Sequence, residues 1–367
     1  MRLPTYEELA SVEEQLEVLE WPLDEPLFVV GPPGSGKTVL AVRRAEIVSD
    51  WEKAKGVVLV TYNRMLRRLL DLLNNGSVKV STMHSFIGSD HRQRTKGQPV
   101  PTQNDPYDFD WQAMLASSHQ ARVRPSRSHL IVDEGQDLPE GFFSYIARHV
   151  ALYLTVFADE DQALTQGHTT LEQIKSNAIL ADPVILHRNH RNSPEVARLA
   201  EHFHSGRLPA AEVARKSSGE LPRLFHTVSI NSTASLVSNW RQTRGGTVGV
   251  IVYNNSTGEE IHQQLLRLLS GSRVDFYRNE HKNEESTNVL EDGVTILNKE
   301  SVKGQEFDAV FILELERFIP CAHHSEKRAM YMMCSRARDH LFLVSGPGDL
   351  SKPAAEALPG VEILERS

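Results

Sequence analysis

The sequence predicts an α/β protein made of two similar halves, and three observations support this. Short runs of β-branched and aliphatic residues alternate with amphipathic helical patterns along most of the 367 residues. Several runs are apolar at consecutive positions, as is typical of strands in a parallel sheet that helices cover on both faces. The strand candidates divide into two similar sets near residues 180–185. We therefore expect two tandem domains, 1–183 and 184–367, each with a mostly parallel sheet.

The expected elements follow from hydrophobic periodicity in chain order. The first set of apolar runs predicts strands at 27–30, 57–61, 78–82, 130–133, 152–157 and 184–186, and amphipathic spacing predicts a helix at 64–73. Residues 88–128 are rich in Gly, Pro and Asp, so we expect a small inserted lobe at about 87–128 with one short helix at 110–118. In the second half, strands are expected at 224–228, 248–253, 274–277, 294–297, 309–313 and 341–344. The helices there are expected at 194–203, 233–240, 259–269 and 326–338.

Composition excludes several classes of protein. The chain is 40% hydrophobic and 24% charged with a net charge of −8, which excludes a histone-like polybasic protein but not a local basic groove. No apolar run reaches the ~18 residues of a membrane span, and the N-terminus lacks a secretory pattern. The two cysteines cannot build a disulfide scaffold. We therefore expect a cytoplasmic protein that does not enter a membrane.

The segment GPPGSGKT at residues 31–38 fits the phosphate-binding pattern G-x-x-x-x-G-K-[ST]. An apolar run precedes it and a helical pattern follows, whereas a Gly-Pro surface turn would need neither. Lys37 is expected to neutralise the β- and γ-phosphate oxygens, and the Thr38 hydroxyl is expected to bind Mg²⁺. The backbone cradle for the phosphates is expected from Gly31, Gly34, Ser35 and Gly36.

A second signature is the apolar run at 129–132 that ends in two carboxylates. Asp133 is expected to hold the Mg²⁺ ion, and Glu134 is expected to orient and deprotonate the attacking water. An Asp-Glu pair at a strand end is common and by itself indicates only a solvated surface. Together with the phosphate loop, it predicts an ATP hydrolase that uses ATP and Mg²⁺.

The segment DEGQD at 133–137 resembles the D-E-x-Q-D motif of superfamily 1 DNA helicases of the UvrD/Rep type, and further motifs of that family follow in order. The resemblance implies two tandem RecA-like P-loop NTPase cores. It also implies that Gln15 recognises adenine, and that Glu306 in KGQEF at 303–307 contacts the ribose. His190 occupies the position where the family usually stacks a tyrosine on adenine, and its smaller ring predicts weaker stacking.

The same resemblance assigns catalytic roles to three further residues. Gln162, in FADEDQ at 157–162, is expected to sense the γ-phosphate and couple it to DNA. Arg191, in NHRN at 189–192, and Arg336, in YMMCSRAR at 331–338, are expected to reach the γ-phosphate from the second core. An interdomain salt bridge is the alternative role for either arginine. The aromatic residue that the family places soon after its glutamine is missing here.

Contacts with a single DNA strand are implied by the motifs TYNR at 61–64, TMHSF at 82–86 and KGQEF. The candidates are Tyr62, Asn63, Arg64, His84, Phe86 and Lys303. Tyr62 and Phe86 each lie beside an apolar run, so a role in the core fits them equally well. Cys321, His323, His324 and Cys334 do not have a standard zinc-binding spacing and predict no metal site.

The resemblance implies a motor that moves 3′ to 5′ on single-stranded DNA, as a translocase or helicase. Family members carry an extra domain inserted in each core, whereas here residues 87–128 form only a small lobe and the second core has no domain-sized segment to spare. We therefore expect little unwinding and a protein partner, such as a nuclease or a repair or defence factor. Two alternatives are a nucleotide-switched regulatory subunit that controls such a partner, and an ATPase directed by RNA.

Overall fold

The computed structural model describes residues 3–51, 53–159, 169–206, 209–278, 290–348 and 350–366. Two compact units are distinguished by their internal contacts. The N-terminal unit comprises Leu3–Pro32 and Gly36–His187, and the C-terminal unit comprises Arg188–Ser367 with the loop residues Pro33–Ser35. In the part of the chain that is described, no helix is long and apolar enough to cross a bilayer.

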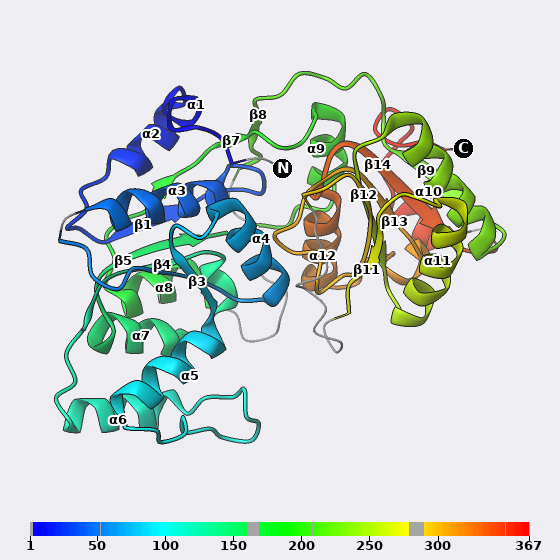
Figure 1. The fold of residues 1–367 in the computed structure, drawn as a ribbon. Coiled ribbons are helices and arrows are strands. Elements are labelled where there is room, and N and C mark those ends of the chain that lie inside the picture. The colour runs from blue at the N-terminus through cyan, green and yellow to red at the C-terminus, as the bar shows by residue number, and fades with distance from the viewer. Residues whose placement is uncertain are drawn as a thin grey trace. The chain divides into compact units, whose positions relative to one another are not determined.

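The N-terminal unit has a six-stranded, entirely parallel sheet in the order β3-β2-β4-β5-β1-β6 (Figure 1). Its strands are β1 (Leu27–Val30), β2 (Val58–Thr61), β3 (Lys79–Thr82), β4 (Arg127–Val132), β5 (Ala151–Ala158) and β6 (Val184–Ile185). All four residues of β1 and of β2 are buried, which explains why these strands are continuously apolar rather than alternating.

Helices precede and connect these strands. They are α1 (Tyr6–Ala10), α2 (Glu13–Glu20), α3 (Lys37–Asp50), α4 (Arg64–Asn74), α5 (Met83–Arg94), α6 (Trp111–Gln120), α7 (Glu140–His149) and α8 (Leu171–Ala178), with a 3₁₀ turn η1 at Gly135–Asp137. Trp111 at the start of α6 attaches the small lobe to α7, with its ring centroid 6.1 Å from that of Phe142. A Cβ at Gly141 would lie 2.3 Å from the Trp111 ring, so only glycine permits this approach.

The C-terminal unit has a seven-stranded parallel sheet in the order β11-β12-β10-β13-β14-β9-β15. The strands are β9 (Arg223–His226), β10 (Thr247–Val252), β11 (Val274–Phe276), β12 (Gly293–Asn298), β13 (Phe307–Ile312), β14 (Ala337–Ser345) and β15 (Glu365–Arg366). Two short strands, β7 (Arg188–Asn189) and β8 (Glu212–Val213), pair separately. The helices are α9 (Pro194–Glu201), α10 (Ile230–Arg244), α11 (Asn255–Leu268), α12 (His324–Cys334) and α13 (Lys352–Glu356), with a 3₁₀ turn η4 at Leu315–Arg317.

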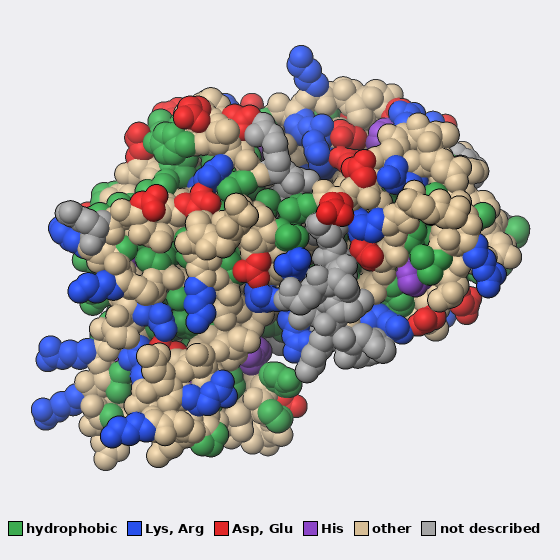
Figure 2. Space-filling view, viewed as in Figure 1, with side chains coloured by type: hydrophobic (Ala, Val, Ile, Leu, Met, Phe, Trp, Pro, Cys, Tyr) green, Lys and Arg blue, Asp and Glu red, His purple; other side chains and the backbone are tan. Residues whose placement is uncertain are grey.

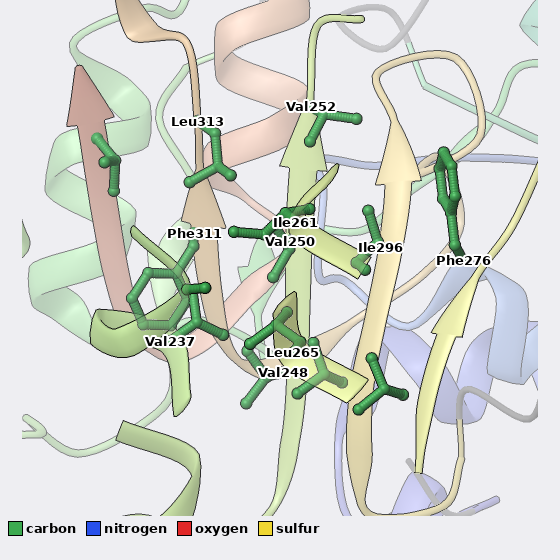
Figure 3. Packing of buried hydrophobic residues seen from close by; sticks show 14 of the residues in the cluster. Val237, Val248, Val250, Val252, Ile261, Leu265, Phe276, Ile296, Phe311 and Leu313 are labelled. Carbon is green, nitrogen blue, oxygen red and sulfur yellow. The ribbon is translucent and has the colours of Figure 1, made fainter. Parts of the chain in front are cut away.

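The core of the C-terminal unit lies between its sheet and the helices α10 and α11 (Figure 3). Val248, Val250 and Val252 occupy alternate positions of β10 and point to this face, where Ile261 and Leu265 of α11 meet them. All five side chains are fully buried. The i, i+4 spacing of the two α11 residues places them on one helix face, as the amphipathic pattern predicts.

The α/β class with mostly parallel sheets is confirmed, and the strand expected at 184–186 is β6, which pairs with β1 in the first sheet. One helix end differs from the expectation. The helix expected at 326–338 ends at Cys334, and β14 already begins at Ala337. Apolar periodicity marks a segment as regular but does not identify its neighbour in the sheet, and a helix end directly followed by a strand leaves no polar gap to detect.

Candidate functional site

The phosphate-binding loop connects β1 to α3 and depends on two glycines with left-handed backbone. Gly34 has φ +80° and Gly36 has φ +91°, and Gly36 is the residue that caps α3. Gln15 on α2 lies beside the loop, because a Cβ at position 36 would be 3.1 Å from its Nε2 atom. Gln15 is only 4% exposed. The N-terminal unit therefore places the glutamine expected to recognise adenine next to Gly36, at the start of α3.

Lys37, the first residue of α3, is held by three acceptors. Its Nζ atom donates to the carbonyl oxygens of Gly31 at 2.6 Å and Pro32 at 2.9 Å, and to Asp159 Oδ2 at 3.0 Å. The last contact is an ion pair between two buried side chains, at 8% and 0% exposure. Because an ammonium group has three N–H donors, all of them are engaged within the loop and at the end of β5.

Asp133 follows β4 directly, and its backbone N–H donates to the Val60 carbonyl at 2.9 Å. Its Oδ1 atom accepts from the Glu134 N–H at 3.1 Å, whereas its Oδ2 atom is buried without a hydrogen-bond partner among the described residues. Burial, followed by the charge of Glu134, raises the pKa of Asp133, although Thr38 and Lys37 act in the opposite direction. A buried carboxylate oxygen of this kind next to a threonine hydroxyl fits a magnesium ion, which takes oxygen ligands.

Glu134 is 5% exposed and has φ +56°, an unusual backbone conformation for a residue that is not glycine. Its Oε2 atom accepts a hydrogen bond of 2.5 Å from Nε2 of Gln136, and Oε1 of Gln136 accepts one of 2.9 Å from the backbone N–H of Asp159. Gln136 and Asp159 were not among the residues singled out from the sequence. The only available signal was their place inside two of the motifs.

In the C-terminal unit, the two candidate arginines are connected through Ser335, which precedes Arg336 and whose carbonyl faces Arg191. Arg191 Nε donates to Glu306 Oε2 at 2.9 Å in an ion pair whose members are each 13% exposed. Its Nη1 atom lies 3.5 Å from the Ser335 carbonyl, next to Arg336. Arg336 is 1% exposed and donates to the carbonyl of Met332 at 3.0 Å. The structure thus joins Arg191 to Glu306, the residue expected to contact ribose.

His190 is half-buried beside Arg191. Gln162 lies outside the described residues. Among those that are described, no group of three or more His, Cys, Asp or Glu side chains could hold a metal ion. Cys334 is buried and Cys321 contacts the Phe318 carbonyl at 3.5 Å.

The candidates for contact with a DNA strand separate by burial. Tyr62 is 37% exposed, and Asn63 caps α4 by accepting from the Leu66 N–H at 2.7 Å, which places Arg64 in its first turn. Nε2 of His84 lies 2.9 Å from the Tyr107 carbonyl oxygen, and burial lowers the pKa of His84.

Two further candidates, Phe86 and Lys303, are buried in the structure. Phe86 is 3% exposed with the Arg127 guanidinium 5.3 Å from its ring centroid, and Lys303 is 1% exposed. Figure 2 shows several basic side chains on the visible face of the lobe around α5 and α6. In the sequence of this lobe, Arg92, Lys96, Arg122 and Arg124 are exposed.

Comparisons with known proteins agree with the nucleotide site. A family model described as an AAA domain matches residues 16–168, the part that contains the phosphate loop and both carboxylates. No curated protein matches the chain. Together, the match and the geometry support a P-loop fold and an NTP-hydrolysing enzyme.

Two solved structures share a distant likeness. The C-terminal domain of a possible DNA helicase from Lactobacillus plantarum WCFS1 is 19% identical at a TM-score of 0.35, and the match covers 48% of this chain and 98% of that one. The PRRSV helicase is 10% identical at a TM-score of 0.43, and the match covers 90% of this chain and 54% of that one. This chain therefore spans about half the length of the viral protein.

Proposed function

We propose that the chain is an ATP-driven motor of the UvrD/Rep superfamily 1 type, and that it acts on single-stranded DNA in the 3′-to-5′ direction. The observation that supports this most is the convergence of Lys37, Thr38, Asp133 and Glu134 at the end of the parallel strands β1 and β4. Ligands of open α/β sheets bind outside the carboxyl ends of the strands, which is where these four residues lie.

In the proposed reaction, the loop binds the phosphates of ATP through its backbone N–H groups and Lys37. Thr38 and Asp133 would hold Mg²⁺, which neutralises charge on the β- and γ-phosphates when it is bound. Glu134 orients a water molecule and accepts its proton as the water oxygen bonds to the γ-phosphorus. The bond from that phosphorus to the β–γ bridging oxygen breaks, which yields ADP and inorganic phosphate.

The C-terminal unit is proposed to complete the site. Arg191 and Arg336 would supply positive charge to the transition state in addition to that of Lys37 in the N-terminal unit. Arg191 would have to exchange Glu306 for phosphate, and the release of Glu306 would free it to contact the ribose. This exchange offers a way for nucleotide binding to change the C-terminal unit, as a motor requires.

For the strand itself, we propose contacts from Tyr62, Asn63, Arg64 and His84, which lie at or near the surface at the ends of β2 and β3. Backbone contacts of this kind distinguish poorly between DNA and RNA. The deciding experiment is steady-state ATP turnover without polynucleotide and with single-stranded DNA, duplex DNA or RNA, at several salt concentrations. We expect single-stranded DNA to stimulate ATP turnover, and we expect this stimulation to weaken as the salt concentration rises. E134Q should show no turnover under any of these conditions. Turnover without stimulation would favour a regulatory ATPase subunit, and stimulation by RNA alone would favour an RNA-directed enzyme.

We further propose that the isolated chain unwinds long duplexes poorly and works with a protein partner, for example a nuclease. Among the described residues between α5 and β4, α6 is the sole helix of the lobe. In the C-terminal unit, α9, α10 and α11 are occupied in packing against the unit's own sheet or against each other. Little surface is left to engage a duplex, in which separation of each base-pair step costs ~1.4 kcal/mol. Processive unwinding of a 3′-tailed duplex over hundreds of base pairs by the purified chain would contradict this.

A further inference from the structure

We propose that Gln136 is a positioning residue, which holds the Glu134 carboxylate in the orientation needed to accept a proton from the attacking water. This inference rests on the proposed ATP hydrolysis and adds to it a residue that acts through Glu134.

The orientation of the Gln136 amide follows from its neighbours. A backbone N–H can only donate, so the group that faces Asp159 N at 2.9 Å must be the amide oxygen. The NH₂ group then faces Glu134, 2.5 Å from Oε2, where an ionised carboxylate accepts it. The amide cannot flip without placing two donors or two acceptors against each other. Gln136 is 2% exposed, so water cannot replace either bond.

The backbone brings Gln136 into reach of both partners. Residues 135–137 form the 3₁₀ turn η1 immediately after Glu134. A Cβ at Gly135 would lie 2.8 Å from Cγ1 of Val156, so this turn is pressed against β5. Gln136 therefore ties a carboxylate after β4 to the last described residue after β5.

The bond restricts the carboxylate in a way that its own backbone does not. Glu134 has three side-chain torsions, and with Oε2 fixed by Gln136 they are confined to a narrow range. A proton acceptor must lie within hydrogen-bond distance of the water in a defined direction, and a displacement of about 1 Å can cost about 100-fold in rate. Loss of this bond should therefore lower turnover far more than it lowers nucleotide affinity.

Two substitutions separate the two bonds of the amide. Q136M removes both bonds with little change in side-chain length. Q136E keeps an acceptor for Asp159 N but replaces the donor toward Glu134 by an oxygen. The matched control is N74L, which removes another buried amide of the same unit, at 2% exposure, whose bonds go to the backbone of Val78 and to the Ser77 hydroxyl.

We expect both Gln136 variants to lose about 10- to 100-fold in kcat for ATP, while the Kd for a fluorescent ATP analogue changes less than about threefold. N74L should keep the kcat of the parent, and its loss of thermal stability provides the reference for a purely structural defect. The proposal would be overturned if either variant, Q136M or Q136E, kept the kcat of the parent. A kcat that falls only together with ATP affinity and thermal stability would assign Gln136 a structural role and also overturn it. The variant E134Q, run in parallel, tests the proposed function separately, because retained turnover there refutes Glu134 as the base whatever Gln136 does.

Discussion

Substitution of Asp159 by Asn is expected to tighten nucleotide binding, even though it removes an ion pair. Lys37 engages all three of its N–H donors, one of them with Asp159 at 3.0 Å. A phosphate can therefore contact Lys37 only if one of these acceptors is given up, and Asp159 is the one that carries a charge. The Asp159 carboxylate competes with the phosphate for the same ammonium group.

The size of the effect follows from the separation of the charges. At an effective dielectric constant of about 20, two unit charges 3 Å apart attract by roughly 5 to 6 kcal/mol, and desolvation of a buried pair offsets most of this. If the parent loses a net of about 1 to 2 kcal/mol when Lys37 leaves Asp159 for the phosphate, D159N avoids this loss. The variant should then bind ATP about 5- to 30-fold more tightly. The nucleotide-free protein should at the same time unfold more easily, because Lys37 then lacks its counter-charge.

The assay is equilibrium titration of a fluorescent ATP analogue, in an E134Q background that prevents hydrolysis, together with thermal unfolding. D182N is the matched control, because Asp182 pairs with Lys175 while 90% exposed and such pairs contribute little. Equal or weaker binding by D159N with an intact fold would refute the competition between carboxylate and phosphate.

Three further predictions concern the chemistry and the stability of the two units. K37A should lose ATP hydrolysis together with nucleotide affinity, whereas E134Q should lose hydrolysis and still bind ATP, so turnover and equilibrium binding measured on the same samples check both roles. R191A and R336A should lower kcat strongly, about 10- to 1,000-fold by analogy with other donors to a transition-state charge, with smaller changes in ATP affinity; a variant of either residue that turns over like the parent would argue against closure of two cores. Burial alone would raise the pKa of Glu195, but hydrogen bonds from nearby serines outweigh it and lower that pKa from 4.5 to about 2. The carboxylate therefore stabilises the fold above pH ~4.5 and loses this contribution as the pH falls toward ~2, so E195Q should lower the free energy of unfolding by about 1 kcal/mol at pH 7 and by less at pH 3, measured by urea denaturation. A pH-independent difference would assign the effect to packing.

Part of the site could be predicted from the sequence because it is encoded locally. The order of strand β1, loop and helix α3 is contiguous, and Gly36, which the pattern specifies, has the positive φ that caps the helix. Asp133 likewise follows an apolar strand directly. Sheets with parallel strands bring such strand ends to one edge, so the proximity of Asp133 to Thr38 follows from the class of fold.

Other features could not be predicted because they depend on which segments become neighbours. Phe86 and Lys303 belong to motifs that suggest surface contacts, yet they are 3% and 1% exposed. Burial of a lysine depends on the partners that surround it in space, and motif spacing carries no information about them.

The sequence by itself determined the α/β class, the phosphate loop and the two carboxylates, since each depends on residues that are close along the chain and on a hydrophobic period that any parallel sheet imposes. Only the tertiary structure decided that Lys37 pairs with Asp159, 122 residues away, and that Gln136 connects Glu134 to the end of β5. These contacts join the ends of strands that are neighbours in the sheet but distant in the chain. The order of strands in a sheet results from the packing of the whole unit, and no local pattern of residues records it.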